Sequence, residues 1–244
     1  IRHWENKCAL RKERRPVIRY QYDDGTVMCM FGFRSCIQAG IQLSDLLYSG
    51  RLRYVGRKIE TLLGKFEAIK GAAFNDEVRS FLAKIPIMRV WEHDVTIKSG
   101  GYFAADKDYG DIDVMAYDTS RDILYLIECK NTNPAKNIKE MKTEMDEYLG
   151  RGDNPERDKK RALVLKHLRR HRWVTEHINE VAKHIGVAVT PRVKSMMLTA
   201  TVIPTSYLKR EKIPMSILNY PELKIKGVNL LDSCKEPDLS VLDI

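Results

Sequence analysis

The sequence predicts an α/β protein in which helices flank a mixed central sheet and a smaller α+β extension precedes this core. Three observations lead to this class. Segments that alternate charged and apolar residues predict strands, apolar residues three or four apart predict amphipathic helices, and the two kinds of segment follow one another along the chain. We expect an N-terminal extension over residues 1–70, a core over 71–225 and a C-terminal tail over 226–244, loosely held from Asp232 onward.

The N-terminal extension begins with a predicted β-hairpin. Apolar residues alternate through Ile18–Tyr22 and again through Val27–Phe31, and Asp24-Gly25 lies between the two runs. Asp-Gly between alternating apolar runs is typical of a tight hairpin turn. We expect a helix over Gln38–Leu52.

Two amphipathic helices are expected next, separated at Gly71. Apolar residues fall at helical spacing from Ile59 to Ile69 and again from Phe74 to Ile85, where Pro86 ends the second run. Glu77 borders the second apolar stripe, so its carboxylate could reach a sheet beneath the helix. Its alternative role is that of an ordinary flanking glutamate whose head group lies in water.

The central strands carry an unusual set of charges. Ile87–Ile97 is the first expected core strand, and a loop over Ser99–Gly110 leads to Asp111-Ile112-Asp113-Val114. After a turn at Asp118–Asp122 comes Ile127-Glu128-Cys129-Lys130. A turn centred on Ser120 and Arg121 places Asp113 opposite Glu128 and Asp111 opposite Lys130, with Cβ atoms about 5 Å apart.

This pairing predicts three carboxylates and one lysine on a single sheet face, with the apolar neighbours Ile112, Val114, Ile127 and Cys129 turned inward. Like charges this close repel one another, so the cluster requires a cation such as a divalent metal in addition to Lys130. The alternative is structural, because the same short patterns occur on surface strands as solvated faces or cross-strand ion pairs.

The second half of the chain alternates helices and strands. Helices are expected near Ile138–Leu149, over Glu156–Arg172 and over Val174–Ile185, and a strand near Lys194–Ile203. The apolar run Ile213–Tyr220 is a candidate for a final strand.

Asp113, followed by Glu128-Cys129-Lys130 on the next strand, resembles the PD-(D/E)xK nuclease superfamily. The resemblance covers about residues 71–220, includes Phe74-Asn75-Asp76-Glu77-Val78 as a first core helix, and is closest to restriction-type and Holliday-junction-resolvase-like members. Ile112 stands where the motif name has proline. The resemblance implies a restriction-endonuclease-like αβββαβ core.

The resemblance also implies the site residues and the cofactor, Mg²⁺ or Mn²⁺. It implies Asp113, Glu128 and the backbone carbonyl of Cys129 as metal ligands, with Asp111 assisting. Catalytic roles would fall to Asp113, Glu128, Lys130 and Glu77. The Cys129 thiol points away from this face and is expected to be inert.

A strongly basic helix is the expected nucleic-acid contact. Residues 157–172 carry eight Lys or Arg against one Asp. Such a run is often only a solvated face, but beside a metal-hydrolysis motif it favours phosphate binding. The residues in its two rows are Lys159, Lys160, Lys166, His167, Arg170 and His171.

Bulk composition agrees with a DNA partner. The formal net charge is +9, and 43% hydrophobic with 31% charged residues is typical of globular proteins. Five scattered cysteines favour a reducing compartment, cytoplasmic or nuclear, and no apolar run is long enough to span a membrane. The chain starts at Ile1, and we expect it to belong to a larger restriction, repair or defence protein, with a homodimer or further subunits as possible assemblies.

The sequence therefore predicts a Mg²⁺-dependent endodeoxyribonuclease. Two alternatives stay open: a non-cleaving nucleic-acid-binding module on the same fold, and an RNA endonuclease. Retention of Asp113, Glu128 and Lys130 together argues against the first, and the absence of a stacking-aromatic signature argues against the second.

Overall fold

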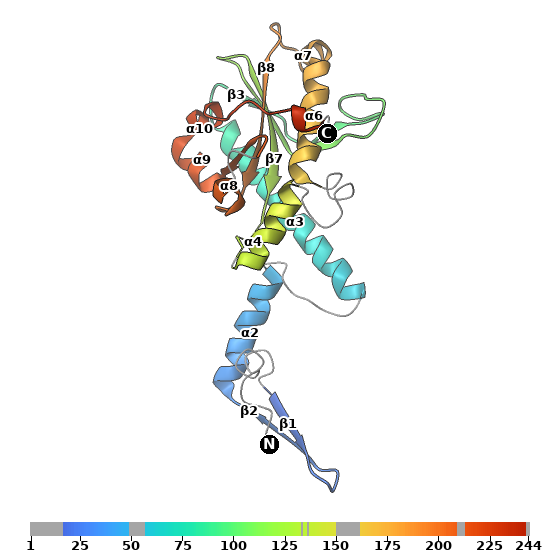
Figure 1. Cartoon of the computed structure of the whole chain (residues 1–244), viewed down its shortest axis with the longest axis vertical. Helices are drawn as coiled ribbons and strands as arrows, with labels where there is room; N and C mark the ends of the chain where they lie inside the picture. Colours follow the sequence, from blue (N-terminus) through green and yellow to red (C-terminus); the bar gives the residue numbers. More distant parts are fainter. Residues whose placement is uncertain are drawn as a thin grey trace. The chain divides into compact units, whose positions relative to one another are not determined.

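The computed structural model of the chain describes residues 17–48, 57–132, 134–135, 137–149, 162–208 and 213–242. The chain divides into two compact units, Ile1–Ala68 and Ile69–Ile244. Each is described by itself below, and Figure 1 labels the elements of both.

The predicted N-terminal hairpin is confirmed. Strand β1 (Val17–Gln21) pairs antiparallel with β2 (Val27–Phe31), from Val17 opposite Phe31 to Gln21 opposite Val27. Gly25 has a positive φ of 85° in the turn, which a residue without Cβ adopts at no steric cost. Helix α2 (Phe33–Tyr48) follows and begins five residues before its predicted start.

The prediction of two separate helices on either side of Gly71 is wrong. A single helix, α3, runs from Arg57 to Ala83 and passes through Gly71 and the boundary between the two units. A glycine inside a helix costs only about 1 kcal/mol relative to alanine, which the packing of Phe74, Val78 and Leu82 easily outweighs. The helix ends before Pro86, as predicted.

The second unit contains a mixed five-stranded sheet in the order β3-β6-β7-β8-β9. Its strands are β3 (Met88–Val90), β6 (Val114–Asp118), β7 (Ile123–Lys130), β8 (Arg192–Thr199) and β9 (Ser216–Asn219). The pairs β3–β6 and β6–β7 are antiparallel, whereas β7–β8 and β8–β9 are parallel. The α/β class and the mixed sheet are confirmed, as is the candidate final strand.

The predicted first core strand, Ile87–Ile97, divides into two. Only β3 joins the central sheet, whereas β4 (Val95–Ile97) pairs antiparallel with β5 (Gly110–Ile112) in a separate two-stranded sheet. The chain bends at Asp113, between β5 and β6, so that these consecutive strands belong to different sheets.

Helices cover both faces of the central sheet (Figure 1). Alternate residues of β7 contact different layers. Tyr125, Ile127 and Cys129 pack with α3, α9 (Tyr220–Lys226) and α10 (Val228–Asp232). Leu124 and Leu126 pack with α6 (Leu163–Glu176) and α7 (Ile178–Ile185). Because both faces are covered, every side chain of β7 from Ile123 to Cys129 is buried.

The remaining helices are α4 (Ile138–Leu149), where predicted, and the short α8 (Thr205–Leu208) and 3-10 helix η2 (Ser240–Leu242). The predicted break between two helices near residue 173 lies instead at His177, between α6 and α7. No helix in the described ranges combines the length and apolar character needed to cross a membrane.

The prediction of a loosely held tail from Asp232 onward is wrong for the described residues. The Asp232 carboxylate accepts a hydrogen bond from the Tyr125 hydroxyl at 2.9 Å and pairs with Arg121. Further along, Leu239, Val241 and Leu242 pack against the cluster that includes Leu168 of α6. These contacts attach the C-terminal segment to the core.

Candidate functional site

The predicted register of the central hairpin is confirmed. Val114 pairs with Ile127 and Asp118 with Ile123, the alignment expected from a turn at Ser120 and Arg121. Asp113 follows one residue beyond the last pair, and its carboxylate oxygen Oδ2 accepts a hydrogen bond from the Cys129 backbone N–H at 2.8 Å. The chain therefore brings Asp113 directly against the Glu128-Cys129-Lys130 segment.

Glu128 is the centre of a buried charge cluster, and only 5% of its surface is exposed. Its Oε1 lies 2.7 Å from Lys130 Nζ, and its Oε2 pairs with the Arg170 guanidinium and lies 3.6 Å from His167 Nδ1. Burial opposes ionisation of this carboxyl. The imidazole of His167 and the charges of Lys130 and Arg170 outweigh that cost and hold the pKa of Glu128 below its ordinary range.

His167 is fully buried and joins this cluster to the sheet. Its Nε2 lies 3.1 Å from the carbonyl oxygen of Leu126, which can only accept, so Nε2 carries a proton. Nδ1 faces Glu128 without a hydrogen-bond partner within reach. The imidazole therefore lies beside the carboxylate without a hydrogen bond to it.

Arg170, on α6, forms an ion pair with Glu128. Its Nε donates to the Tyr109 carbonyl oxygen at 3.1 Å while its Nη1 donates to Glu128. Gly110, with a positive φ of 86°, leaves the room that this guanidinium occupies, because a Cβ there would lie 3.2 Å from Arg170 Nη2. Arg170 thus joins α6, the start of β5 and the end of β7.

Asp113 and Lys130 have pKa values displaced by the same surroundings. Burial and the negative charge of Glu128 raise the pKa of Asp113 to about 6, and Lys130 offsets only part of the effect. Burial disfavours the Lys130 ammonium, but Glu128 and Asp113 overcome it and raise the pKa of Lys130. Lys130 is therefore an ammonium at neutral pH, and Asp113 is a carboxylate whose charge is incompletely compensated.

The donors at this position fit a small divalent cation. In an extended strand the N–H and the C=O of one residue point to the same side. The Cys129 N–H points to Asp113, so the Cys129 carbonyl points to that side as well. One or two carboxylates, a carbonyl and waters form the oxygen set that Mg²⁺ prefers. Its charge would relieve the destabilised Asp113. In the described ranges no group of three or more His, Cys, Asp or Glu side chains forms a metal cage, so water would complete the shell.

The Cys129 thiol does not take part. Its side chain is buried among the apolar residues on the opposite face of the sheet. Burial and the nearby carboxylates of Asp113 and Glu128 raise its pKa well above the ordinary value. The expectation of an inert, core-facing thiol is consistent with this position.

The expectation that Glu77 reaches the site is wrong. Helix α3 packs on the sheet face that carries Cys129, opposite the face that carries Glu128 and Lys130. Glu77 is exposed, and its carboxylate lies 3.7 Å from Lys224 Nζ of α9. The apolar stripe predicted its helix correctly, but not which face of the sheet that helix covers.

The expectation that Asp111 lies opposite Lys130 is also wrong. Because of the bend at Asp113, Asp111 pairs with Thr96 of β4, and its side chain is exposed. The paired register ends at Val114, and Asp113 lies one residue beyond it, where it meets the Cys129 N–H.

Two residues that the sequence did not suggest border the site. The Arg79 guanidinium donates to the main-chain oxygen of Asp113 and pairs with the Asp94 carboxylate, and it also lies 2.7 Å from Asp76. The Asp94 charge contributes to the raised pKa of Asp113. A cavity of about 330 Å³ opens here, lined by Ala72, Asn75, Arg79, His93 and Asp94. No local pattern marks Arg79 or Asp94, because each meets Asp113 only through the tertiary fold.

The basic helix differs from the prediction. His167, Arg170 and His171 are buried rather than arranged as outward rows. His171 Nδ1 lies 2.8 Å from Ser195 Oγ, and burial lowers its pKa to about 4, so it is neutral. Lys166 is exposed as expected, whereas Lys159 and Lys160 lie outside the described residues. Lys166, His167, Arg170 and His171 do lie on one helix, but the sequence did not reveal that the sheet contains a carboxylate that pairs with Arg170.

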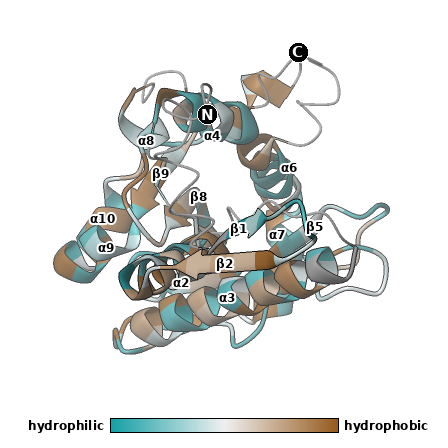
Figure 2. Ribbon diagram, turned by 90° about the horizontal axis from the view of Figure 1, so that it is seen from below, coloured by the Kyte–Doolittle hydropathy of each residue, from teal (hydrophilic) through white to brown (hydrophobic). Residues whose placement is uncertain are grey.

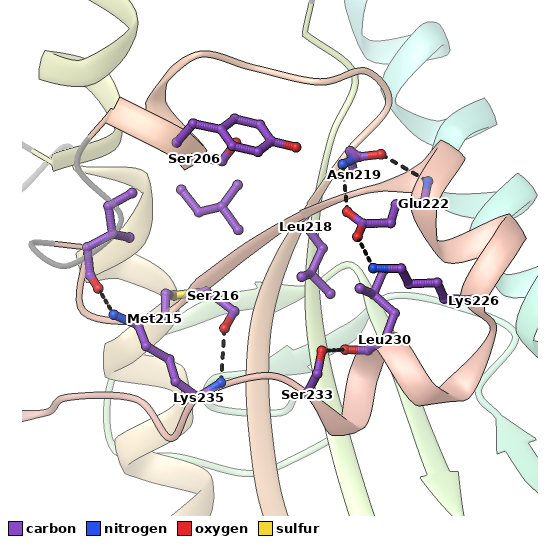
Figure 3. Close-up of a pocket in the computed structure, with 13 residues that line it drawn as sticks. Ser206, Met215, Ser216, Leu218, Asn219, Glu222, Lys226, Leu230, Ser233 and Lys235 are labelled. Carbon is purple, nitrogen blue, oxygen red and sulfur yellow. Dashed lines mark hydrogen bonds and ion pairs between the residues drawn. The ribbon is translucent and has the colours of Figure 1, made fainter.

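A second pocket lies along β9, away from these residues (Figure 3). Its polar side chains already have partners: Glu222 binds Asn219 and Lys226, and the Lys235 backbone N–H donates to Ser216 Oγ. None of the predicted site residues lines it, so it does not belong to the candidate site.

Fold and site together define an α/β protein with a buried carboxylate–lysine cluster at the end of an antiparallel strand pair. Residues 9–216 match a family model described as anti-phage protein Upx-like. The chain belongs to this family, which implies a defence role. Of the three roles expected from the sequence, restriction, repair or defence, the family match supports defence. Comparisons with curated proteins and with solved structures found no match.

Proposed function

We propose that this anti-phage protein is a Mg²⁺-dependent endodeoxyribonuclease of the PD-(D/E)xK type with a restriction-endonuclease-like core. The observation that carries the proposal is the β6–β7 register, which sets Asp113 against Glu128, Cys129 and Lys130. The parallel β8 beyond β7 and the helices on both faces are compatible with this assignment.

In this proposal each residue of the cluster has a distinct task. Asp113, Glu128 and the Cys129 carbonyl would hold Mg²⁺ or Mn²⁺, which supplies Lewis-acid polarisation of the phosphate and a hydroxide nucleophile when bound. Lys130 is protonated, so it acts by charge: it holds the attacking water or stabilises the extra negative charge on phosphorus. Arg170 keeps Glu128 ionised and oriented, and His167 lies beside the same carboxylate oxygen.

The proposed substrate is DNA. The net charge of +9 favours a polyanion, and Lys166 extends from the outer side of the helix that carries Arg170. The basic residues Lys159 and Lys160 precede it in the sequence and remain candidates for phosphate contacts. His167, Arg170 and His171 are instead assigned to support of the site.

The test is incubation of the purified chain with supercoiled plasmid in Mg²⁺, in Mn²⁺ and in EDTA. We expect nicked or linear DNA with either metal and intact plasmid in EDTA. Asp113→Ala and Lys130→Ala should each lower the cleavage rate at least about 100-fold, since each removes a group that stabilises charge in the transition state.

Glu77→Gln and Asp111→Asn serve as matched controls, because both carboxylates are exposed and lie outside the cluster. They should cut at the wild-type rate. A wild-type chain that binds DNA without cutting would support the non-cleaving alternative. Equal cleavage by Asp113→Ala and wild type would place the active site elsewhere.

A further inference from the structure

The N-terminal hairpin and α2 form an ordered segment without a core of its own. None of the side chains described between residues 19 and 47 is buried. The three hydrophobic clusters all consist of residues from Phe74 onward. An isolated two-stranded hairpin is marginal in water, and burial is the main source of stability for such elements. This segment therefore requires a surface to cover it.

The uncovered surface is large and apolar. Ten large hydrophobic side chains of this segment are exposed: Tyr20, Tyr22, Val27, Met28, Met30, Phe31, Phe33, Ile37, Ile41 and Leu43. Aromatic side chains offer about 150–250 Å² each, and half-exposed ones roughly half of that. The four aromatic side chains among the ten therefore offer on the order of 400 Å², about half of one partner's share of a standard interface, and the six aliphatic ones add to this. Figure 2 shows the hydrophobic colour along β2.

Charge argues against a nucleic-acid partner at this surface. Residues 17–48 contain two arginines and three aspartates, whereas the whole chain has a net charge of +9. The segment is thus close to neutral and sparsely charged. A surface of this kind meets a second copy of itself without bringing like charges together, and twofold self-association is the commonest assembly of soluble proteins.

Strand β2 supplies the geometry for such a contact. It pairs with β1, and no other described strand pairs with it, so among the described residues its second edge is open. Natural edge strands are usually protected by charges, proline or bulges. The β2 sequence, Val-Met-Cys-Met-Phe, contains no charge and no proline, and all five residues are exposed. An unprotected apolar edge of this kind is a template for pairing.

We propose that two copies of the chain associate through antiparallel pairing of their β2 strands about a twofold axis, forming a four-stranded sheet. A register centred on Cys29 uses all five residues, with Val27 opposite Phe31 of the partner subunit. Facing residues of the two β2 strands then place their apolar side chains beside one another on each face of the joined sheet. This inference does not depend on nuclease activity.

The first test is the mass of the full chain in solution, measured by light scattering after size exclusion and by sedimentation. We expect twice the chain mass of 28.2 kDa. Met30→Lys with Phe31→Lys should return the protein to a monomer, because two lysines at the paired edge oppose their counterparts. Tyr207→Lys with Ile225→Lys is the matched control, since it also replaces two exposed apolar residues outside the segment.

The second test uses the native thiol, so it does not depend on how a variant folds. Opposed residues on antiparallel strands have Cα atoms about 4.5–5.5 Å apart, within reach of a disulfide. In a Cys8→Ser background, diamide should accept the two electrons and two protons of the paired Cys29 thiols and yield a covalent dimer. Cys29→Ser should abolish that band, and Cys36→Ser should retain it.

A wild-type chain that is monomeric at tens of micromolar would overturn the proposal. So would a dimer that survives Met30→Lys with Phe31→Lys, because its interface must then lie elsewhere. A dimer that depends on β2 but gives no Cys29 crosslink would overturn the strand pairing.

Discussion

Asp113 is the residue at which stability and the proposed function oppose each other. Its carboxyl is partly buried beside Glu128, and its pKa is raised to about 6 from an ordinary value near 3.8. A raised pKa means that the folded chain disfavours the charged form. The free-energy cost of ionising Asp113 in the folded chain is absent below the unfolded pKa and grows as the pH rises through 6. The charge of Asp113 therefore lowers the stability of the folded chain unless a cation compensates it.

We predict that Asp113→Asn stabilises the metal-free protein while abolishing cleavage. A rise in pKa from 3.8 to about 6 corresponds to about 3 kcal/mol. The gain in the free energy of unfolding of Asp113→Asn should therefore approach this value at pH 8 and vanish below pH 4. The asparagine oxygen can still accept from the Cys129 N–H. Urea unfolding in EDTA at several pH values measures the gain, with the exposed Asp111→Asn as control. A gain that grows as the pH falls would contradict the assignment.

At the scale of elements, α6 positions the acidic end of β7. Arg170 reaches across from this helix to Glu128 and to the Tyr109 carbonyl, so one side chain links a helix to two segments of β structure. Buried carboxylates that lose a cationic partner are strongly destabilising, because the remaining charge is uncompensated. The fork of a guanidinium also serves two acceptors at once, which a lysine ammonium does less well.

Arg170→Ala should therefore lower the free energy of unfolding by about 3 kcal/mol, and Arg170→Lys should recover only part of this loss. Arg172→Ala provides the comparison on the same helix, because Arg172 donates to the Leu239 carbonyl. Urea titration at neutral pH measures all three variants. If Arg170→Ala costs no more than Arg172→Ala, the Glu128 pair contributes little to stability.

At the scale of the whole molecule, family membership implies a role in resistance against phage, and the proposed site can be tested for a part in it. We predict that Asp113→Ala and Lys130→Ala raise plaque counts to those of cells without the gene, whereas Glu77→Gln protects like wild type. Protein levels measured by immunoblot ensure that loss of protection does not reflect loss of the chain. Full protection by Asp113→Ala would show that defence does not use this site.

The sequence by itself determined the features that depend on neighbours along the chain. Asp24-Gly25 between alternating apolar runs defined the first hairpin, and the turn at Ser120 and Arg121 fixed the register that unites Asp113 with Glu128. Such features are predictable because strand alternation and turn chemistry are local. Pairing across a short turn leaves little freedom of register when one face is buried.

Only the tertiary structure decided which elements face the site. Glu77 and Arg79 lie on one helix, yet the Arg79 guanidinium donates to the main-chain oxygen of Asp113, whereas the Glu77 carboxylate faces Lys224 of α9. Likewise Arg170 belongs to a charge run that resembles a solvated surface, and the buried Glu128 that binds it is 42 residues away in sequence. Packing between distant segments determines these contacts, and no local periodicity records which face of a sheet a helix will cover.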